Sequence, residues 1–299
     1  RLKDIMPNLS GGSAYLAPSN KTHMEGEGDF SKFNYAGRNL HFGVRELAMA
    51  AIANGLMLHG GLRAYVATFF VFSDYTKPMV RLAALMGLPV TYVFTHDSIG
   101  VGEDGPTHEP IEQMAMLRAL PNINVFRPAD ATETAAGWYL AVTSTKTPTA
   151  LVLTRQNLPQ LPGSSKDALK GAYVVSEARD PANMAGILIG TGSEVSLAIE
   201  AQEELAKSGI DVRVVSMPCM DLFEQQSAEY KESVLPKDVR ARVAVEALSS
   251  FGWGRYVGLD GATVCMESFG ASAPAAQLFE KFGFTKQHVV EVAMKVIAA

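Results

Sequence analysis

The sequence concentrates polar side chains in one segment, residues 95–110, which reads THDSIGVGEDGPTHEP. The segment holds two histidines, four acids and three glycines, and it has little apolar periodicity. It follows a predicted strand, and open α/β sheets bind ligands beyond the carboxyl ends of their strands, so we interpret it as a candidate site. His96 and His108 could share a metal, but no third ligand has suitable spacing, and the glycines favour close approach of a substrate. A solvated surface loop is the remaining alternative.

Two other clusters could also carry chemistry. Glu46 follows the tripeptide GVR and precedes a helical run at 47–52, where an acid ordinarily does no more than complement the helix dipole. Phe69, Phe72 and Tyr75 recur every three residues and therefore share a predicted helical face. Such a stripe ordinarily belongs to the core, and a platform for stacking a ligand ring is the alternative.

The elements that position these residues alternate between strands and helices from Arg63 onward. This is the pattern of βαβ units and predicts parallel sheets. Predicted strands lie at 63–69, 89–95, 123–126 and 149–154, and predicted helices at 72–86, 111–118 and 131–144. Residues 156–170 then carry prolines, a glycine and two serines without hydrophobic periodicity, which indicates an interdomain linker.

A second unit follows the linker. Strands are expected at 187–190, 212–216, 242–246 and 262–266, with two helices near the end of the chain. Ser193 is a candidate N-cap for a helix that runs to Lys207 and stops at Gly209. The turn at 190–193 reads GTGS, which weakly resembles a phosphate loop, and we interpret it as a tight turn.

The predicted fold is therefore α/β, with two consecutive three-layer domains whose sheets are mainly parallel. The first domain is expected at 1–155, the linker at 156–172 and the second domain at 173–299.

Composition narrows the function classes. The chain has 299 residues, 47% of them hydrophobic and 19% charged, which fits two globular domains. A formal net charge of -5 argues against nucleic acid as a partner, because duplex affinity depends on Lys and Arg. Cys219 and Cys265 offer neither a metal cluster nor a disulfide framework, and we expect both to be buried.

The sequence also bears on compartment. No stretch of about 18 consecutive apolar residues and no signal-peptide core occur, so we expect no membrane partner and a cytoplasmic location. The chain begins at Arg1 rather than Met, which indicates a fragment or a processed product.

The clusters together resemble the transketolase family. In order, the matching motifs are GGSAYLAPSN, HFGVRE, ATFFVFSDY, THDSIGVGEDGPTHEP, RPAD and TRQNLP, and the match continues through GTGSEVSLAIEA, SMPCMDLFE and ESFGASAPA. The resemblance covers nearly the whole chain. It implies a pyrimidine-binding domain followed by a transketolase C-terminal domain. It also implies an enzyme that uses thiamine diphosphate to move a two-carbon ketol unit from a ketose phosphate of the xylulose 5-phosphate type to an aldose phosphate.

The resemblance assigns roles at the cofactor end of the site. Glu46 matches the glutamate that hydrogen-bonds the aminopyrimidine ring and so has a catalytic role. Phe69, Phe72 and Tyr75 match the aromatic pocket for the pyrimidine. His108 matches a histidine near the reacting carbons and is a candidate for proton transfer, because the ordinary pKa of histidine lies close to working pH.

The resemblance also assigns the substrate contacts. Ser19, His96 and Arg155 match residues that hold the sugar phosphate, and Asp104 matches one that binds a sugar hydroxyl. Another phosphate-binding arginine of the family would lie upstream of Arg1. No metal ligand is expected within this chain.

The resemblance finally implies partners. The family's N-terminal domain holds a divalent metal, such as Mg or Ca, and through it the cofactor's diphosphate, and its GDG-containing motif does not occur in this part of the sequence. We therefore expect the isolated chain to be inactive, to need an N-terminal transketolase domain or subunit, and to form a homodimer.

One position departs from the family pattern, which usually reads GGSADL. Tyr15 stands where the family usually has aspartate. Either its side chain points at the site and impairs cofactor binding, or the backbone shifts and the change is harmless.

Two alternative functions stay open at the level of sequence. One is a component of another thiamine diphosphate enzyme, such as a 2-oxo acid dehydrogenase β subunit or a deoxyxylulose phosphate synthase. His96, Asp104, His108 and Arg155 together disfavour this reading, because they suit a ketose phosphate. The other is a non-catalytic assembly domain, which Tyr15 and the missing N-terminal domain would favour.

Overall fold

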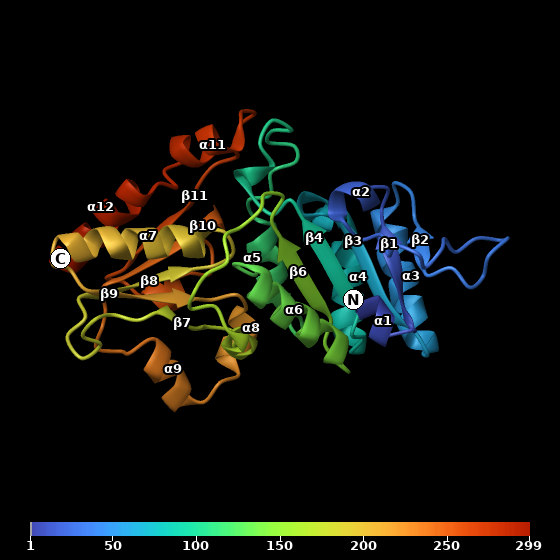
Figure 1. Cartoon of the computed structure of the whole chain (residues 1–299), viewed down its shortest axis with the longest axis horizontal. Helices are drawn as coiled ribbons and strands as arrows, with labels where there is room; N and C mark the ends of the chain where they lie inside the picture. Colours follow the sequence, from blue (N-terminus) through green and yellow to red (C-terminus); the bar gives the residue numbers. More distant parts are fainter. Residues whose placement is uncertain (1) are drawn as a thin grey trace.

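The computed structural model describes residues 2–299, which form two α/β domains (Figure 1). The first domain is built on a six-stranded sheet with the order β2-β1-β3-β4-β6-β5, in which every neighbouring pair is parallel. Its strands are β1 (Leu9–Ser13), β2 (Asn39–His41), β3 (Arg63–Phe69), β4 (Thr91–Thr95), β5 (Asn124–Phe126) and β6 (Thr149–Leu153). Its helices are α1 (Leu2–Ile5), α2 (Ala17–Asn20), α3 (Glu46–His59), α4 (Ser73–Met86), α5 (Gln113–Arg118) and α6 (Ala131–Thr143), with 3-10 helices η1 (Phe70–Phe72) and η2 (Ile99–Val101).

Helices cover both faces of the first sheet. Strand β3 shows the division, because Val66 faces a core that includes Met49 of α3 and Val80 of α4. Its neighbour Tyr65 faces the opposite side and meets Trp138 of α6 edge to face, with ring centroids 6.3 Å apart. Alternate side chains of one strand thus pack against different helices, which makes a three-layer domain.

The second domain repeats this plan around a five-stranded sheet with the order β11-β10-β8-β9-β7. Its strands are β7 (Tyr173–Ser176), β8 (Gly186–Gly190), β9 (Val212–Ser216), β10 (Arg242–Ser249) and β11 (Ala262–Met266). Its helices are α7 (Glu194–Lys207), α8 (Met220–Glu224), α9 (Ala228–Val234), α10 (Gly254–Val257), α11 (Ala275–Lys281) and α12 (Lys286–Ala298). All pairings are parallel except that of β7 with β9. Two domains with mainly parallel sheets are therefore confirmed.

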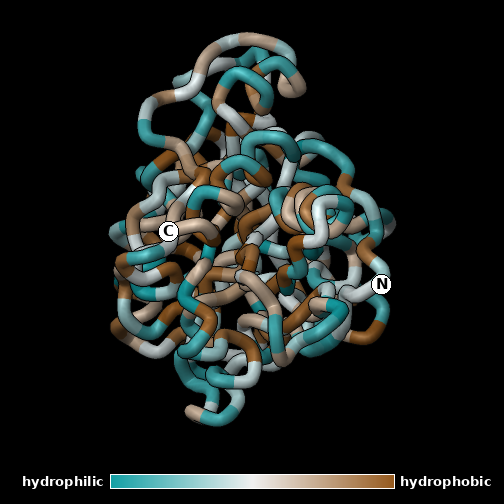
Figure 2. The backbone as a smooth tube through the Cα atoms, turned by 90° about the vertical axis from the view of Figure 1, so that its left-hand side faces the viewer, coloured by the Kyte–Doolittle hydropathy of each residue, from teal (hydrophilic) through white to brown (hydrophobic). Residues whose placement is uncertain are grey.

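The second sheet is also covered on both faces. Leu188 of β8 joins a core with α7 and α12, whereas Ile187 and Ile189 join one with Phe223 and Trp253. Figure 2 shows hydrophobic stretches running through the interior and hydrophilic stretches in the outer loops. Cys219 is buried and Cys265 half-buried, and both are free thiols.

Several elements differ in detail from their prediction. The helix expected to start at Phe72 starts at Ser73, after the 3-10 helix η1, and β10 runs on to Ser249. Ser193 does occupy the N-cap position of α7, but its hydroxyl makes no capping hydrogen bond and donates to the Glu194 carboxylate at 2.6 Å instead. Gly209 follows the helix end with a φ of +76°, as a helix stop requires.

The segment expected as a linker is bound to the first domain. It contains a third 3-10 helix, η3 (Lys166–Lys170), and the Asp130 carboxylate accepts hydrogen bonds from Gln160, the Leu161 amide and Ser164. Asp130 also caps α6, where it accepts from the Glu133 amide. One carboxylate thus fixes both the start of a helix and the path of the chain between the sheets.

No helix within residues 2–299 is long and apolar enough to cross a membrane.

Candidate active site

The predicted site residues follow the carboxyl ends of strands in the first sheet. Because neighbouring strands in this sheet are parallel, these ends lie along one edge, where open α/β sheets bind ligands. Ser19 follows β1, Glu46 follows β2, and Phe72 and Tyr75 follow the end of β3. His96, Asp104 and His108 follow β4, and Arg155 follows β6. The topology therefore brings segments that are far apart in the sequence to one edge.

The three aromatic residues form a ladder of nearly parallel rings. The Phe69 and Phe72 ring centroids are 6.2 Å apart with planes 6° from parallel, and those of Phe72 and Tyr75 are 5.8 Å apart at 16°. The prediction that they share one helical face is wrong, since Phe69 ends β3, Phe72 lies in η1 and Tyr75 lies in α4. The 3-10 helix η1, with three residues per turn, lies between β3 and α4 and continues the three-residue spacing at which these rings align.

Two histidines extend the ladder. The His96 ring stacks on Phe69 with centroids 3.7 Å apart, and the His108 ring meets Phe72 edge to face at 5.6 Å. Phe69 is buried, whereas the Tyr75 side chain is 60% exposed. The ladder thus runs from the buried end of β3 to the surface and joins two clusters that the sequence presents separately.

A chain of hydrogen bonds fixes the His96 ring. The Thr95 hydroxyl donates to Asn20 Oδ1 at 2.5 Å, so the same hydroxyl oxygen accepts from His96 Nδ1 at 2.9 Å. Asn20 in turn donates to the Ser13 hydroxyl at 3.2 Å. His96 therefore carries its proton on Nδ1 when neutral, and Nε2 is the acceptor.

The surroundings of His96 favour its neutral form. Burial, together with the nearby Arg155 guanidinium, lowers the pKa of His96 to about 4. Asp104 and Asp97 act in the opposite direction, and His108 adds to the lowering. His96 is a predicted site residue, and so are three of the groups that shift its pKa, namely Arg155, Asp104 and His108. The structure brings them within electrostatic reach.

Glu46 begins α3, as expected, and its side chain is buried. Its carboxyl makes no hydrogen bond to any other residue in the described part of the chain. Ser19 lies exposed in α2, next to Asn20. The unpaired acid and the aromatic ladder fit an aminopyrimidine, which offers ring faces for stacking and nitrogen atoms for hydrogen bonds.

Tyr15 lies in the turn between β1 and α2. Its backbone φ is +68°, in the left-handed region that side chains other than Asn, Asp and Gly rarely adopt. The side chain is 75% exposed, so it does not pack against the rest of this chain. An aspartate would suit this backbone conformation better than tyrosine does.

Sequence reasoning missed several residues around the site. Asn20 and Thr95 orient His96, and Asp97 binds the buried Arg127. Glu109 is only 2% exposed, and neither carboxylate oxygen has a hydrogen-bond partner among the described residues. Burial raises the pKa of Glu109 to about 7, against an opposing contribution from the Ala271 amide. Buried polar residues of this kind leave no periodic signal, because their partners are distant in the sequence.

Among residues 2–299, no three His, Cys, Asp or Glu side chains are grouped so that they could hold a metal ion.

Comparison with known proteins adds to this geometry. Residues 2–160 match the family model "Transketolase, pyrimidine binding domain", and residues 171–285 match "Transketolase-like TK C-terminal domain". The chain belongs to the transketolase family. It is 61% identical over 289 residues to a transketolase of Bacillus subtilis and 57% identical over 289 residues to one of Geobacillus stearothermophilus. Each match covers 95% of this chain and 43% of the relative, so the chain spans less than half the length of these transketolases.

Solved transketolase structures have the same fold. A transketolase of Pichia stipitis in complex with xylulose 5-phosphate superposes with a TM-score of 0.95 at 47% identity, covering 99% of this chain and 44% of that one. A second Pichia stipitis structure, in complex with sedoheptulose 7-phosphate, gives a TM-score of 0.94. An inactive β4 tetramer of a split-gene transketolase has a TM-score of 0.78 at 26% identity, and the match covers 99% of this chain and 94% of that chain.

Proposed function

We propose that this chain supplies the pyrimidine-binding half of a transketolase site. The complete site would transfer a two-carbon ketol unit from a ketose phosphate of the xylulose 5-phosphate type to an aldose phosphate. The observation that carries the proposal is the aromatic ladder, with His96 and His108 packed on it, at the same sheet edge as the unpaired Glu46. Thiamine diphosphate, when bound, supplies the carbanion chemistry of such a transfer.

The residues of this chain hold and orient the cofactor's pyrimidine end. Phe69, Phe72 and Tyr75 offer apolar ring faces, and their burial of the pyrimidine excludes water from the region around Glu46. Glu46, which has no hydrogen-bond partner among residues 2–299, hydrogen-bonds the aminopyrimidine ring.

The polar residues at the same edge bind the sugar phosphate. The phosphate is held by Arg155, Ser19 and His96. Arg155 suits this role because a guanidinium donates two hydrogen bonds to a phosphate at once. A phosphate dianion next to Nε2 of His96 would favour the protonated ring, which then donates to the phosphate. Solved relatives contain xylulose 5-phosphate and sedoheptulose 7-phosphate, which supports this substrate class.

Asp104 and His108 act nearer the reacting carbons. Asp104 binds a sugar hydroxyl, as a carboxylate accepts such a hydrogen bond. His108 Nδ1 lies 2.9 Å from the Thr107 hydroxyl, which leaves Nε2 as the ring nitrogen that can exchange a proton with the substrate.

The other half of the site comes from an N-terminal transketolase domain or subunit. That domain holds a divalent metal, such as Mg or Ca, and the cofactor's diphosphate. Apolar side chains that stand exposed near this sheet edge, among them Tyr15, Val44 and Leu47, support an interface there. We infer a homodimer of the complete protein, in the cytoplasm, with activity in the pentose phosphate pathway. We also infer domains at 1–155 and 173–299 joined by a linker at 156–172.

Replacement of Glu46 tests the proposal. In the chain assembled with an N-terminal transketolase half, we expect Glu46→Gln to lower ketol transfer by about 10²-fold or more, the range for one acid/base group. The matched control is Glu200→Gln, which changes an exposed acid on α7 and should leave turnover unchanged. Equal turnover in the two variants would refute the role of Glu46.

Titration with the cofactor distinguishes the proposed function from the two alternatives. If the assembled complex does not bind thiamine diphosphate at millimolar concentration with metal present, the chain is a non-catalytic assembly domain and the proposal is wrong. Binding of the cofactor followed by oxidative decarboxylation of pyruvate, without ketol transfer, would instead assign it to another thiamine diphosphate enzyme.

A further inference from the structure

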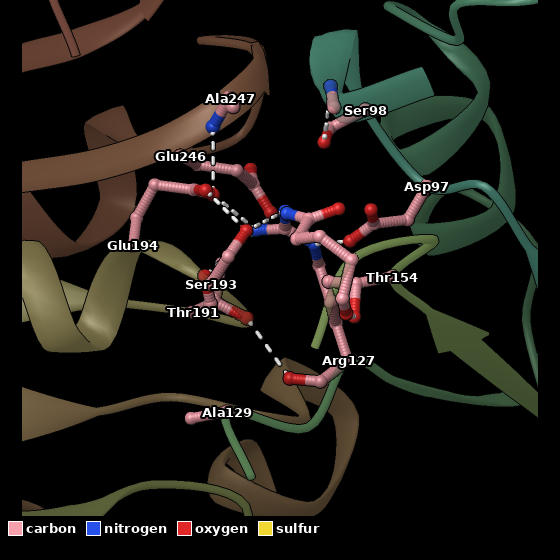
Figure 3. Close-up of polar contacts among 12 residues, drawn as sticks. Asp97, Ser98, Arg127, Ala129, Thr154, Thr191, Ser193, Glu194, Glu246 and Ala247 are labelled. Carbon is pink, nitrogen blue, oxygen red and sulfur yellow. Dashed lines mark hydrogen bonds and ion pairs between the residues drawn. The ribbon is translucent and has the colours of Figure 1, made fainter. Parts of the chain in front are cut away.

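A buried arginine joins the two domains directly behind the candidate phosphate site. Arg127 follows β5 in the first domain and is completely buried (Figure 3). Its Nε donates to Asp97 Oδ2 at 2.8 Å, and its Nη1 donates to the Thr191 carbonyl at 2.7 Å and to Glu194 Oε2 at 2.5 Å. One guanidinium therefore bonds the residue after His96 and, at the same time, the turn before α7 in the second domain.

The network is closed at its far end as well. Glu194 Oε2 also accepts from the Ala247 amide at 2.9 Å, and Glu194 Oε1 accepts from the Ser193 hydroxyl. Gly192 has a φ of +58° and lies against the guanidinium, where any side chain would collide with it. Since Asp97, Arg127 and Glu194 are all buried, each charge depends on the others for compensation.

The turn that Arg127 holds is strained without such support. His96 has a φ of +62°, a conformation that costs on the order of 1 kcal/mol for a residue other than glycine and persists only where the surroundings impose it. The side chain of His96 is held by Thr95, and the next residue, Asp97, is held by Arg127. The orientation of His96 is thus fixed from two sides, by Thr95 directly and by Asp97 through Arg127, which is bound in turn to Glu194 of the second domain.

We propose that Arg127 is a positioning residue, through which Glu194 of the second domain holds the turn that presents His96 to the substrate phosphate. This inference rests on the proposed function for its link to phosphate, but the mechanical link from Glu194 to His96 can be measured without any substrate. It gives the second domain a part in substrate binding although none of its residues needs to touch the substrate.

The structure contains a matched control for the test. Arg118 of α5 forms a second ion pair between the domains, donating to both oxygens of Glu246 in β10 at 2.8 Å. Glu246 also accepts from Trp253 Nε1 at 2.7 Å. Like Glu194, it is therefore a buried carboxylate whose two oxygens both accept hydrogen bonds. Glu194→Gln and Glu246→Gln therefore make the same chemical change at two interdomain arginines, of which only Arg127 reaches Asp97.

The first measurement follows the His96 ring by NMR titration in this chain. The pKa of His96, about 4 with the turn in place, should rise by about one unit in Glu194→Gln as water reaches the loosened ring. Loss of the Glu194 charge alone would lower this pKa, so a rise reports movement and not electrostatics. Glu246→Gln should leave the pKa in place, and an equal response of the two variants would overturn the inference.

The second measurement compares fructose 6-phosphate with fructose as donors, using the chain assembled with an N-terminal half. Glu194→Gln should raise KM for fructose 6-phosphate about tenfold, with kcat within about twofold, because a misplaced His96 weakens binding of the phosphate. KM for fructose should not change in Glu194→Gln. In Glu246→Gln, KM should change for neither fructose 6-phosphate nor fructose. Equal losses with both donors would mean a general structural role and would contradict the inference.

This design distinguishes failure of the proposed function from failure of the positioning role. If the assembled wild type transfers no ketol unit but Glu194→Gln still moves the His96 titration, the proposed function fails and the positioning role stands. If Glu194→Gln does not fold, Asp97→Asn cuts the network at its other end and must give the same selective loss with fructose 6-phosphate. An unselective effect of Asp97→Asn would overturn the proposal.

Discussion

At the scale of the residue, burial sets the protonation of the groups around the site. His96 is kept neutral although Asp97 follows it in the sequence, and Glu109 is kept protonated up to about pH 7. The sequence shows these residues but not their burial, which depends on elements brought in from elsewhere. Glu109, for example, lies against Gly270, which is 161 positions later in the numbering of the chain.

Glu109 gives a prediction about pH and stability. Its ordinary pKa of 4.5 applies in the unfolded chain and about 7 in the folded one, so the folded state binds the proton more tightly. The stability that protonated Glu109 contributes is complete below pH 4.5 and is lost as the pH rises through 7. Glu109→Gln, which mimics the protonated form, should therefore gain roughly 2 to 3 kcal/mol of stability relative to the wild type as the pH is raised from 5 to 8.

Urea unfolding at the two pH values measures this gain. Glu103→Gln serves as the control, because Glu103 is an exposed acid in the same loop and should show no gain. A Glu109→Gln variant whose stability changes with pH in parallel with the wild type would contradict the prediction.

The site residues differ in how far the sequence could predict them. Glu46, His96 and His108 stand out in dense motifs, and the resemblance to transketolases gives them roles. Arg127 lies in the equally plain motif RPAD, but its role depends on a contact with Glu194, which is 67 residues away. Long-range ion pairs of this kind leave no local signal in a single sequence.

At the scale of the element, regular hydrophobic patterns predicted the structure well and short or glycine-rich segments did not. The strands at 63–69 and 212–216 were predicted with their observed bounds, because each is a buried run that contains β-branched or aromatic residues. Strand β1 reads LSGGS and β2 has three residues, so neither carries an alternating pattern. The three-residue spacing of Phe69, Phe72 and Tyr75 is visible in the sequence, but it predicted one helical face and not a ladder that runs from β3 through η1 to α4.

The turn from β1 to α2 gives a prediction at this scale. Tyr15 occupies a left-handed conformation there, which costs a residue such as tyrosine roughly 1 kcal/mol and costs aspartate less, since its short side chain hydrogen-bonds locally. Tyr15→Asp should therefore stabilise the chain by about 0.5 to 1 kcal/mol in urea unfolding. Tyr15→Ala keeps the unfavourable conformation without that hydrogen bond and should give no such gain.

This comparison separates backbone strain from the loss of an exposed aromatic ring. If Tyr15→Ala were as stabilising as Tyr15→Asp, the strain at this turn would not be the cause.

At the scale of the whole molecule, the two domains form one unit through buried ion pairs as well as apolar contacts. Arg127 and Arg118 each donate to a glutamate of the second domain, and Ser272 of the second domain donates to the Glu103 carbonyl at 2.6 Å. The loop after β4 and the segment before α11 consequently lie side by side at the top of Figure 1. Substitutions in the second domain can therefore affect residues at the sheet edge of the first.

The chain nevertheless spans only 43% of the length of the relatives it matches. Our account holds that ketol transfer requires this chain and an N-terminal half together.

The most direct test assays ketol transfer from xylulose 5-phosphate to ribose 5-phosphate with thiamine diphosphate and a divalent metal. The chain is assayed alone and then with an N-terminal transketolase half whose binding to it has been verified. We predict no transfer by the chain alone and transfer by the assembled pair. Transfer by the chain alone, or none by the assembled pair, would contradict the account.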